Sequence, residues 1–247
     1  MSAASDKFEQ NVAKSINRLP GITATRPKVS TEYSDVRVEY GQFTGRRSMW
    51  VEVKMNHTDN LSNPRVFYKN GKWQTTYDTP AAKHAVNILN KSTKAKQFIT
   101  SIAKFSGIPE KSIYIPTTKS GLKEPGAVPL SVMKAYFDQP NVNRYIANQE
   151  NMNLGEIVTE HYTIGKAEPA YYMQAADDFY LISRKNPLKM QGVPVLTGIG
   201  DFKVRVGTRS EFYEVQAEIK IKQMPDSPFS VAPGTKKKNP FLTMKKS

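Results

Sequence analysis

The stretch SDVRVEYGQFTGRRSMWVEVKM, residues 34–55, contains the pattern on which the fold prediction depends. From residue 36 to 40, apolar side chains alternate with polar ones, as they do in a half-buried β-strand. Residues 49–55 form a second run of strand-favouring side chains, and residues 44–46 between the two runs are typical of a turn. We therefore expect a β-hairpin here.

Three charged residues of this hairpin point to a chemistry. Asp35 begins the first strand, and Glu52 and Lys54 are two residues apart on the second, so they share one face of it. Two carboxylates can hold one or two divalent cations, and an ammonium group beside them can orient water or stabilise charge on phosphorus. These residue types predict phosphodiester hydrolysis, with Asp35 and Glu52 as metal ligands. The alternative is a solvated row of ion pairs, which contributes little to stability.

The pattern resembles the PD-(D/E)XK nuclease superfamily, in Ser34-Asp35 followed by Glu52-Val53-Lys54. Ser34 stands where the family name has proline. The resemblance covers roughly the first 120 residues and implies an α/β fold, a restriction-endonuclease-like mixed β-sheet core flanked by helices. It also implies a deoxyribonuclease, most simply an endonuclease, with Asp35, Glu52 and Lys54 as catalytic residues. Mg²⁺ is the implied cofactor, with Mn²⁺ as its substitute.

The resemblance further implies that Glu9, on the first helix, assists the metal site. The alternative is that Glu9 completes a capping box with Asp6, which we expect to be the N-cap of a helix over residues 6–19. Both interpretations stay open at this point. A small nuclease of this kind is similar to stand-alone restriction, phage-encoded or repair endonucleases, and double-strand cleavage by one such centre calls for a homodimer.

The rest of the chain is predicted from local signals. Asn70-Gly71 favours the tight turn of a second hairpin, and Thr79-Pro80 starts helical material that runs to residue 106 with a break near residues 90–92. We expect a strand at residues 112–117 as the continuation of the family core. Residues 130–155 are expected to be helical and residues 156–222 strand-rich, beginning with IVTEHYTI at residues 157–164.

These elements suggest three parts. Residues 1–120 are expected to be the nuclease core, residues 121–224 a strand-rich extension that completes the core or binds DNA, and residues 225–247 a flexible basic tail. The tail prediction depends on composition, since this segment consists largely of Pro, Ser, Gly and Lys.

The net charge of +14, from 36 Lys and Arg against 22 Asp and Glu, favours a polyanionic partner, most simply DNA. The residues predicted to contact nucleic acid are Arg46, Arg47, Lys83, Lys91 and Lys94. The absence of cysteine excludes disulfides and thiolate metal sites, which leaves oxygen ligands and hard cations. With no long apolar run and no signal-like N-terminus, we expect no membrane partner and a cytoplasmic location, in the host if the protein is phage-encoded.

A second copy of the charge pattern provides a comparison within the chain. Asp201 is followed by Glu218 and Lys220 at the same separation, so spacing alone does not distinguish the two hairpins. The first copy has a helix before it, and the second runs into the C-terminal segment within a few residues. We therefore prefer the first as the catalytic site and expect Glu218 and Lys220 to form a solvent-facing row.

Two other functions remain open on the sequence. One is a basic nucleic-acid-binding protein without catalysis, and the other is a virion-associated structural protein that neutralises packaged nucleic acid. His57, His84 and His161 show none of the spacings of zinc or histidine nucleases and are expected to be ordinary polar or core residues. No phosphate-binding loop of the ATPase type is present, so ATP hydrolysis has no support.

Overall fold

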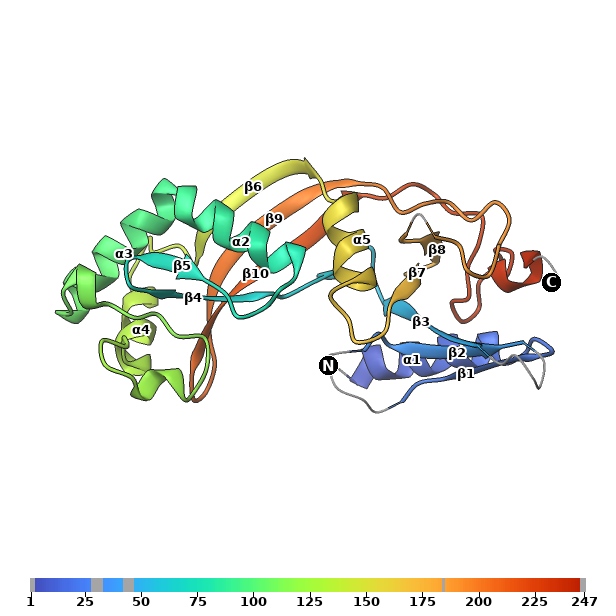
Figure 1. Ribbon diagram of the computed structural model, residues 1–247, viewed down its shortest axis with the longest axis horizontal. Coiled ribbons are helices and arrows are strands. Elements are labelled where there is room, and N and C mark those ends of the chain that lie inside the picture. The colour runs from blue at the N-terminus through green and yellow to red at the C-terminus, as the bar shows by residue number, and fades with distance from the viewer. Residues whose placement is uncertain (1–2, 28–32, 42–46, 184, 245–247) are drawn as a thin grey trace. The chain divides into compact units, whose positions relative to one another are not determined.

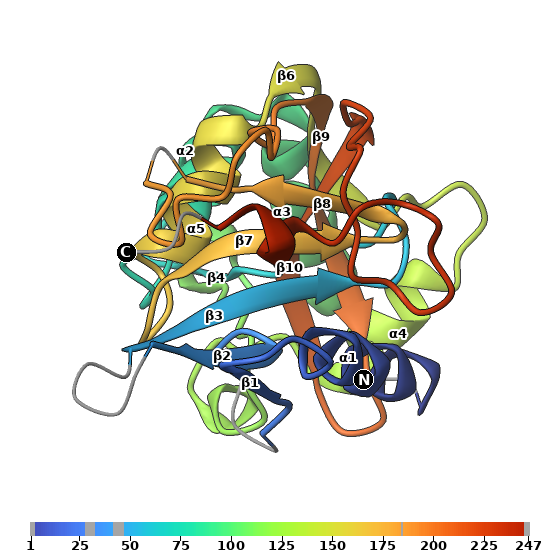
Figure 2. The same ribbon diagram turned by 90° about the vertical axis from the view of Figure 1, so that its right-hand side faces the viewer.

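The computed structural model describes residues 3–27, 33–41, 47–183 and 185–244, and Figures 1 and 2 show the course of the chain. The chain forms two compact units. The first contains Met1–Asp59, Asn153–Ile199 and Ile221–Ser247, and the second contains Asn60–Met152 and Gly200–Lys220. The second unit is thus inserted into the first at two places. Its limits differ from the predicted boundary at residue 120, which falls inside the second unit.

The first unit is built on a five-stranded mixed sheet in the order β1-β2-β3-β7-β8, which Figure 2 shows from β1 upward. Its strands are β1 (Ile22–Thr25), β2 (Val36–Tyr40), β3 (Arg47–Lys54), β7 (Ala170–Ala175) and β8 (Asp178–Leu181). Neighbouring strands are antiparallel except β3 and β7, which are parallel. The predicted hairpin is confirmed as β2 and β3, while its turn at residues 44–46 lies outside the described residues.

Helix α1 (Ala3–Ile16) packs on one face of this sheet. Val12 and Ile16 are fully buried and belong to the same core cluster as Val36 and Val51, from β2 and β3. The apolar residues at four-residue spacing give the helix its buried side, as the sequence predicts. The helix begins three residues earlier than expected, so Asp6 lies inside it and is not its N-cap.

The helix and the parallel strand that complete the sheet differ from the prediction. They are α5 (Gly155–Thr163) and β7, and not the helical stretch from residue 80 and the segment at 112–117. The predicted strand at 157–164 is therefore mostly helix. Its β-branched residues favour a strand, but Val158 and Tyr162, four residues apart, are both buried on one helical face that contacts β7.

The C-terminal segment is also corrected. Residues 225–244 were expected to be a flexible tail, yet Phe229, Val231 and Phe241 are 1–6% exposed and belong to the core of the first unit. A short 3₁₀ helix, η3 (Pro240–Thr243), closes the described segment. Composition is misleading here because the few apolar residues among the prolines and lysines are the ones that the fold buries.

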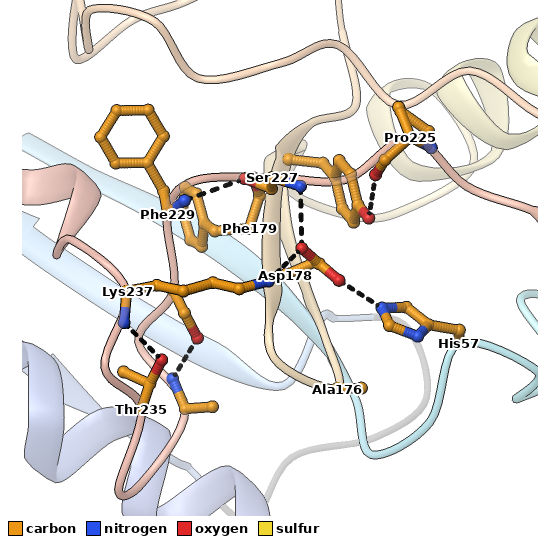
Figure 3. A network of polar contacts seen from close by, with 12 residues as sticks. His57, Ala176, Asp178, Phe179, Pro225, Ser227, Phe229, Thr235 and Lys237 are labelled. Carbon is orange, nitrogen blue, oxygen red and sulfur yellow. Dashed lines mark hydrogen bonds and ion pairs between the residues drawn. The ribbon is translucent and has the colours of Figure 1, made fainter.

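Polar contacts also attach this segment to β8, as Figure 3 shows. The carboxylate of Asp178 accepts hydrogen bonds from the main-chain N–H of Ser227 (2.9 Å) and from Nζ of Lys237 (2.7 Å), and its other oxygen lies 2.7 Å from Nε2 of His57. The charge of Lys237 therefore serves an internal contact and does not lie on a free tail.

The second unit contains a sheet in the order β5-β4-β10-β9-β6 with three helices. The strands are β4 (Arg65–Lys69), β5 (Lys72–Gln74), β6 (Tyr145–Asn153), β9 (Ile199–Thr208) and β10 (Tyr213–Gln223), and the helices are α2 (Pro80–Lys91), α3 (Thr93–Ser106) and α4 (Leu130–Phe137). Two 3₁₀ turns, η1 (Glu110–Ser112) and η2 (Gly121–Lys123), lie between α3 and α4. Helix α2 packs against β4 and β5, and α3 against α4.

Local signals in this unit are largely confirmed. Asn70 and Gly71 both have positive φ, 54° and 78°, as the tight turn between β4 and β5 requires. Thr79 caps α2 by accepting from the N–H of Ala82, and Ser92 ends α2 and caps α3, which is the predicted break.

Two predictions in this unit are corrected. Residues 112–117 form only isolated bridges, Tyr68 with Ile115 and Tyr114 with Ala127, instead of a strand. Residues 145–153, expected to be helical, are strand β6.

The two sheets and their helices make this a mixed α/β fold, as predicted, and the order α1, β1, β2, β3, α5, β7 is consistent with a restriction-endonuclease-like core. None of the described helices is long and apolar enough to cross a membrane.

Candidate active site

Asp35 and Glu52 lie opposite each other across the β2–β3 pair. The register matches Val36 with Val51, and one further step pairs Asp35 with Glu52. Directly opposite residues of an antiparallel pair point to the same face with about 5 Å between their Cβ atoms. The main-chain N–H of Val53 donates to Oδ2 of Asp35 at 2.8 Å and fixes this carboxylate beside β3.

Glu52 is held by two donors on one oxygen and none on the other. Oε1 lies 2.7 Å from Nζ of Lys54 and 3.1 Å from the hydroxyl of Tyr162 on α5. Oε2 is buried and makes no hydrogen bond with a described residue, although the buried Ser34 hydroxyl lies close enough to help lower the pKa of Glu52. A buried carboxylate oxygen without a partner costs free energy, so it marks a position where the protein can accept an additional ligand.

The two carboxylates titrate very differently. Burial, and then the negative charge of Glu52, raises the pKa of Asp35 to about 8. Burial also acts to raise the pKa of Glu52, but the positive charges of Lys54 and Lys166 outweigh it, and the pKa is lowered. Near neutral pH the pair therefore holds one proton on Asp35 and one negative charge on Glu52, as expected for two acids that share a confined space.

Lys54 is a stable cation in this setting. Burial lowers its pKa, but Glu52, Tyr162 and Asp35 outweigh that effect and raise the pKa well above its ordinary value. The Lys54 side chain as a whole is 19% exposed. Its ammonium group therefore stays protonated, and it can stabilise negative charge or orient a water molecule but cannot act as a base.

Three residues of the site come from α5 and the residues after it, and none of them was predicted from the sequence as a site residue. The Tyr162 hydroxyl donates to Glu52. Lys166 lies over the Tyr162 ring, with Nζ 5.7 Å from the ring centre, and the centre of the His161 ring lies 4.9 Å from the same point. Burial and the charge of Lys166 lower the pKa of His161 to about 4, so its imidazole is neutral at neutral pH. In the sequence, the four-residue spacing of Val158 and Tyr162 is the feature that indicates a helix here.

Glu9 lies near the site, and its carboxylate is engaged by its own helix and by Arg26. It is 2% exposed, accepts from Oγ of Ser5 at 3.0 Å, and forms an ion pair with Nε of Arg26 at 2.6 Å. It makes no capping box, since the helix starts before Asp6. Glu9 is close enough for its charge to raise the pKa of Asp35, but its carboxylate is already engaged.

In the described part of the chain, the site offers two carboxylates, and not three or more side-chain ligands, to a hard divalent cation. Among the described residues, no group of three or more His, Asp or Glu side chains is arranged to hold a metal ion. Asp35 and Glu52 provide two carboxylates, one with an unpartnered buried oxygen, and this is the oxygen chemistry that Mg²⁺ prefers. Mg²⁺ is commonly bound through one or two carboxylates and keeps several waters, so two ligands from the chain are sufficient.

The predicted nucleic-acid contacts that the structure describes are all exposed and lie on both units. Arg47 is exposed at the first position of β3, and seven residue steps place it roughly 23 Å along the strand from Lys54. Lys83, Lys91 and Lys94 are exposed on α2 and α3 of the second unit, and Lys83 pairs with Asp78 at 2.5 Å. Arg46 lies outside the described residues.

The second copy of the charge pattern forms a different arrangement. Asp201 on β9 pairs with Lys203 at 3.1 Å, while Glu218 on β10 pairs with Arg205 and accepts from the Tyr145 hydroxyl at 3.1 Å. Lys220 is exposed. These ion pairs lie within β9 and between β9 and β10, so the negative charges of Asp201 and Glu218 are each paired with a neighbouring cation.

The other two histidines have structural contacts. His57 lies 2.7 Å from the carboxylate of Asp178, and His84 lies 3.0 Å from the side-chain oxygen of Gln149 and packs against Phe202. Neither contact resembles a metal site.

No protein-family model matches the chain, and no curated protein matches it in sequence. Among solved structures, HhaI endonuclease in complex with DNA matches 90% of this chain and 92% of its own, with 14% sequence identity and a TM-score of 0.29. At this TM-score the match supports no conclusion about activity. The chemistry of the site therefore has to be inferred from its own geometry.

Proposed function

We propose that this protein is a divalent-metal-dependent nuclease that hydrolyses DNA phosphodiester bonds at Asp35, Glu52 and Lys54. The observation that supports the proposal most is the buried Oε2 of Glu52, which has no described partner and lies on a carboxylate opposite Asp35. A purely structural ion pair between Glu52 and Lys54 does not require a second, protonated carboxylate beside it. A cation site does, because the cation replaces the proton and takes up the unpartnered oxygen.

Asp35 and Glu52 would hold the cation, which supplies Lewis-acid activation and charge neutralisation at the scissile phosphate. Tyr162 and Lys54 fix Oε1 of Glu52 and so leave Oε2 for the ligand. Asp35 is fixed through Oδ2 by the N–H of Val53, and its carboxyl, whose pKa is raised, would have to release its proton to hold a cation. The residues of the chain thus form a site with both carboxylates already oriented.

Lys54 has a role of its own. Its ammonium is protonated and lies 2.7 Å from Glu52, which places a positive charge beside the carboxylate pair. Positive charge held at this position stabilises the additional negative charge of a pentavalent phosphate in the transition state. Lys166, whose charge reaches Glu52, adds to the same positive potential.

DNA is the proposed substrate class because the net charge of +14 favours a polyanion. Exposed lysines on α2 and α3 and the exposed Arg47 are proposed to contact phosphates away from the scissile bond. Cleavage of both strands by a single centre of this kind further predicts that two copies of the chain act together.

The test is cleavage of supercoiled plasmid and of single-stranded DNA with Mg²⁺, with Mn²⁺ or with EDTA. Wild type is compared with Asp35→Ala and Lys54→Ala, and Glu218→Ala is the matched control from the second copy of the pattern. We expect metal-dependent cleavage that is lost in the first two variants and kept in the control.

Two results would contradict the proposal. Loss of cutting only in Glu218→Ala would assign the activity to the other hairpin. Metal-independent DNA binding without cleavage, unaffected by Asp35→Ala, would favour the non-catalytic or virion-associated alternative.

A further inference from the structure

A pocket in the first unit has the features of an anion site and lies outside the proposed catalytic centre. It has a volume of about 270 Å³ and lies between the end of α1 and the C-terminal segment, with Ser15 and Arg18 on one side and residues 230–239 on the other. Its size is just under the roughly 300–1,000 Å³ typical of sites for drug-sized ligands, so it suits a small group.

The lining is rich in hydrogen-bond donors and carries positive charge. It includes Arg18, Lys237, Asn239 and three hydroxyl side chains, and none of its described lining residues is acidic. Arg18 makes no ion pair with a described residue and is exposed. Nζ of Lys237 is already paired with Asp178, so the positive charge that the lining offers to a ligand is that of Arg18. Guanidinium, amide and hydroxyl groups all donate, so the pocket is complementary to an acceptor with several oxygens.

Hydrogen bonds within the C-terminal segment orient the side chains of Thr235 and Asn239. The Thr235 hydroxyl oxygen accepts from the N–H of Lys237 at 3.1 Å, and the side-chain oxygen of Asn239 accepts from the N–H of Phe241 at 3.0 Å. With their oxygens already used as acceptors, the Thr235 hydroxyl and the Asn239 amide have donor hydrogens left for a ligand.

The segment that carries these donors is fixed before any ligand binds. Nζ of Lys237 is bound to Asp178 at 2.7 Å, a contact visible in Figure 3 beside Thr235. The Ser230 hydroxyl joins the segment to the sheet, because Oγ accepts from Nε2 of Gln174 at 3.1 Å and from the N–H of Ala232 at 3.0 Å. A preformed site loses less conformational entropy on binding.

We propose that this pocket binds a phosphate group. Phosphate combines the required negative charge with several acceptor oxygens, and it fits a cavity of this volume. The group can come from a nucleic-acid backbone or from a free phosphate or mononucleotide, since both present the same chemistry. The site is independent of the proposed nuclease activity, because none of its residues belongs to the Asp35–Glu52–Lys54 centre.

The test is a residue-resolved NMR titration of the full chain at constant ionic strength, with inorganic phosphate, adenosine monophosphate and a short single-stranded oligonucleotide as separate ligands. We expect phosphate to shift the amide signals of Ser15, Arg18, Gly234 and Thr235 together. Arg18→Gln should weaken phosphate binding about tenfold by removing a charge-assisted donor. Ser15→Ala, which removes an uncharged hydroxyl of the lining, should weaken it less.

The control is Arg37→Gln, which removes the same charge from a partly exposed position on β2, paired with Glu39, that does not line the pocket. Phosphate affinity of this control should equal that of wild type. Weaker oligonucleotide binding in Arg18→Gln would identify the backbone as the source, and unchanged oligonucleotide binding beside weaker phosphate binding would identify a free phosphate or nucleotide.

The proposal is overturned if phosphate produces no localised shifts at these four residues. It is also overturned if Arg18→Gln and Arg37→Gln weaken binding equally, because that would indicate general electrostatic attraction. Neither result depends on whether the protein cleaves DNA.

Discussion

The hydroxyl of Tyr162 donates to Oε1 of Glu52 across 3.1 Å, and Nζ of Lys54 contacts the same oxygen at 2.7 Å. Two donors on one oxygen orient the carboxylate and leave Oε2 without a described partner. Tyr162 thus acts on the site through Glu52, as a positioning residue supplied by α5. Groups that orient a metal-binding carboxylate in this way tune the affinity of the site.

Replacing Tyr162 by phenylalanine tests this relationship. The ring stays buried in α5 while Glu52 loses one donor, so we expect the Mg²⁺ concentration for half-maximal cleavage to rise about tenfold. The rate at saturating Mg²⁺ should change much less. Tyr171→Phe, which removes the hydroxyl of a partly buried tyrosine of β7 that does not contact Glu52, is the control. Equal metal dependence in the two variants would refute a positioning role.

The raised pKa of Asp35 predicts a pH-dependent stability. An acid with pKa about 8 in the folded protein and 3.8 in an ordinary setting binds its proton more tightly when folded, so its ionisation destabilises the fold as pH rises between these values. Asp35→Asn keeps an oxygen to accept from Val53 and cannot ionise. In EDTA we expect the variant and wild type to be equally stable near pH 4.

Above pH 8 the Asp35→Asn variant should be the more stable protein, by roughly 5 kcal/mol in the free energy of unfolding, because each pH unit between 3.8 and about 8 costs the wild type about 1.4 kcal/mol. The measurement is urea unfolding at a series of pH values without divalent metal. A difference that does not change with pH, or a wild type that is more stable at pH 9, would show that the carboxylate is not held in a strained environment.

Replacing Lys54 should lower DNA cleavage without abolishing metal binding. Lys54→Ala removes a charge that stabilises the transition state and is not a metal ligand, so cleavage is expected to fall by about 100-fold or more. Metal binding should persist, because one cation competing for the Glu52 carboxylate has been removed. Lys220→Ala, the equivalent exposed residue of the second hairpin, should cleave like wild type. Loss of metal binding in Lys54→Ala would require a different role for this lysine.

Removal of residues 225–247 tests the corrected view of the C-terminal segment. Phe229, Val231 and Phe241 are buried in the core of the first unit, and their loss should cost roughly 5 kcal/mol or more, a large part of the stability of a domain. The truncated chain should therefore fail to give a cooperative unfolding transition. The double variant Lys236→Ala, Lys238→Ala changes only exposed residues and should unfold like wild type. A stable truncated protein would restore the flexible-tail interpretation.

The hairpin and its three charged residues were predictable because they are local. Alternation over a few residues predicts β2 and β3, and antiparallel pairing then sets Asp35 opposite Glu52. The same holds for Asn70-Gly71 and the caps at Thr79 and Ser92, where the turn or cap is specified by the residues that form it.

What the sequence did not indicate is non-local. Tyr162 is 110 residues from Glu52, and the strand that lies parallel to β3 is β7, beyond the insertion that forms the second unit. Nothing in residues 60–152 indicates that the sheet of the first unit resumes after them. The role of Glu9 at the metal site was inferred from the family resemblance, but its carboxylate is paired with Arg26, which is seventeen residues away.

Direct measurement of Mn²⁺ binding, by electron paramagnetic resonance at pH 8, tests the central claim without requiring the correct DNA substrate. Wild type should bind Mn²⁺ at one or two sites, Glu52→Gln should lose that binding, and Glu218→Gln, the control in the second hairpin, should keep it. Binding that is absent from wild type, or that is unchanged in Glu52→Gln, would contradict the assignment of Asp35 and Glu52 as a metal site.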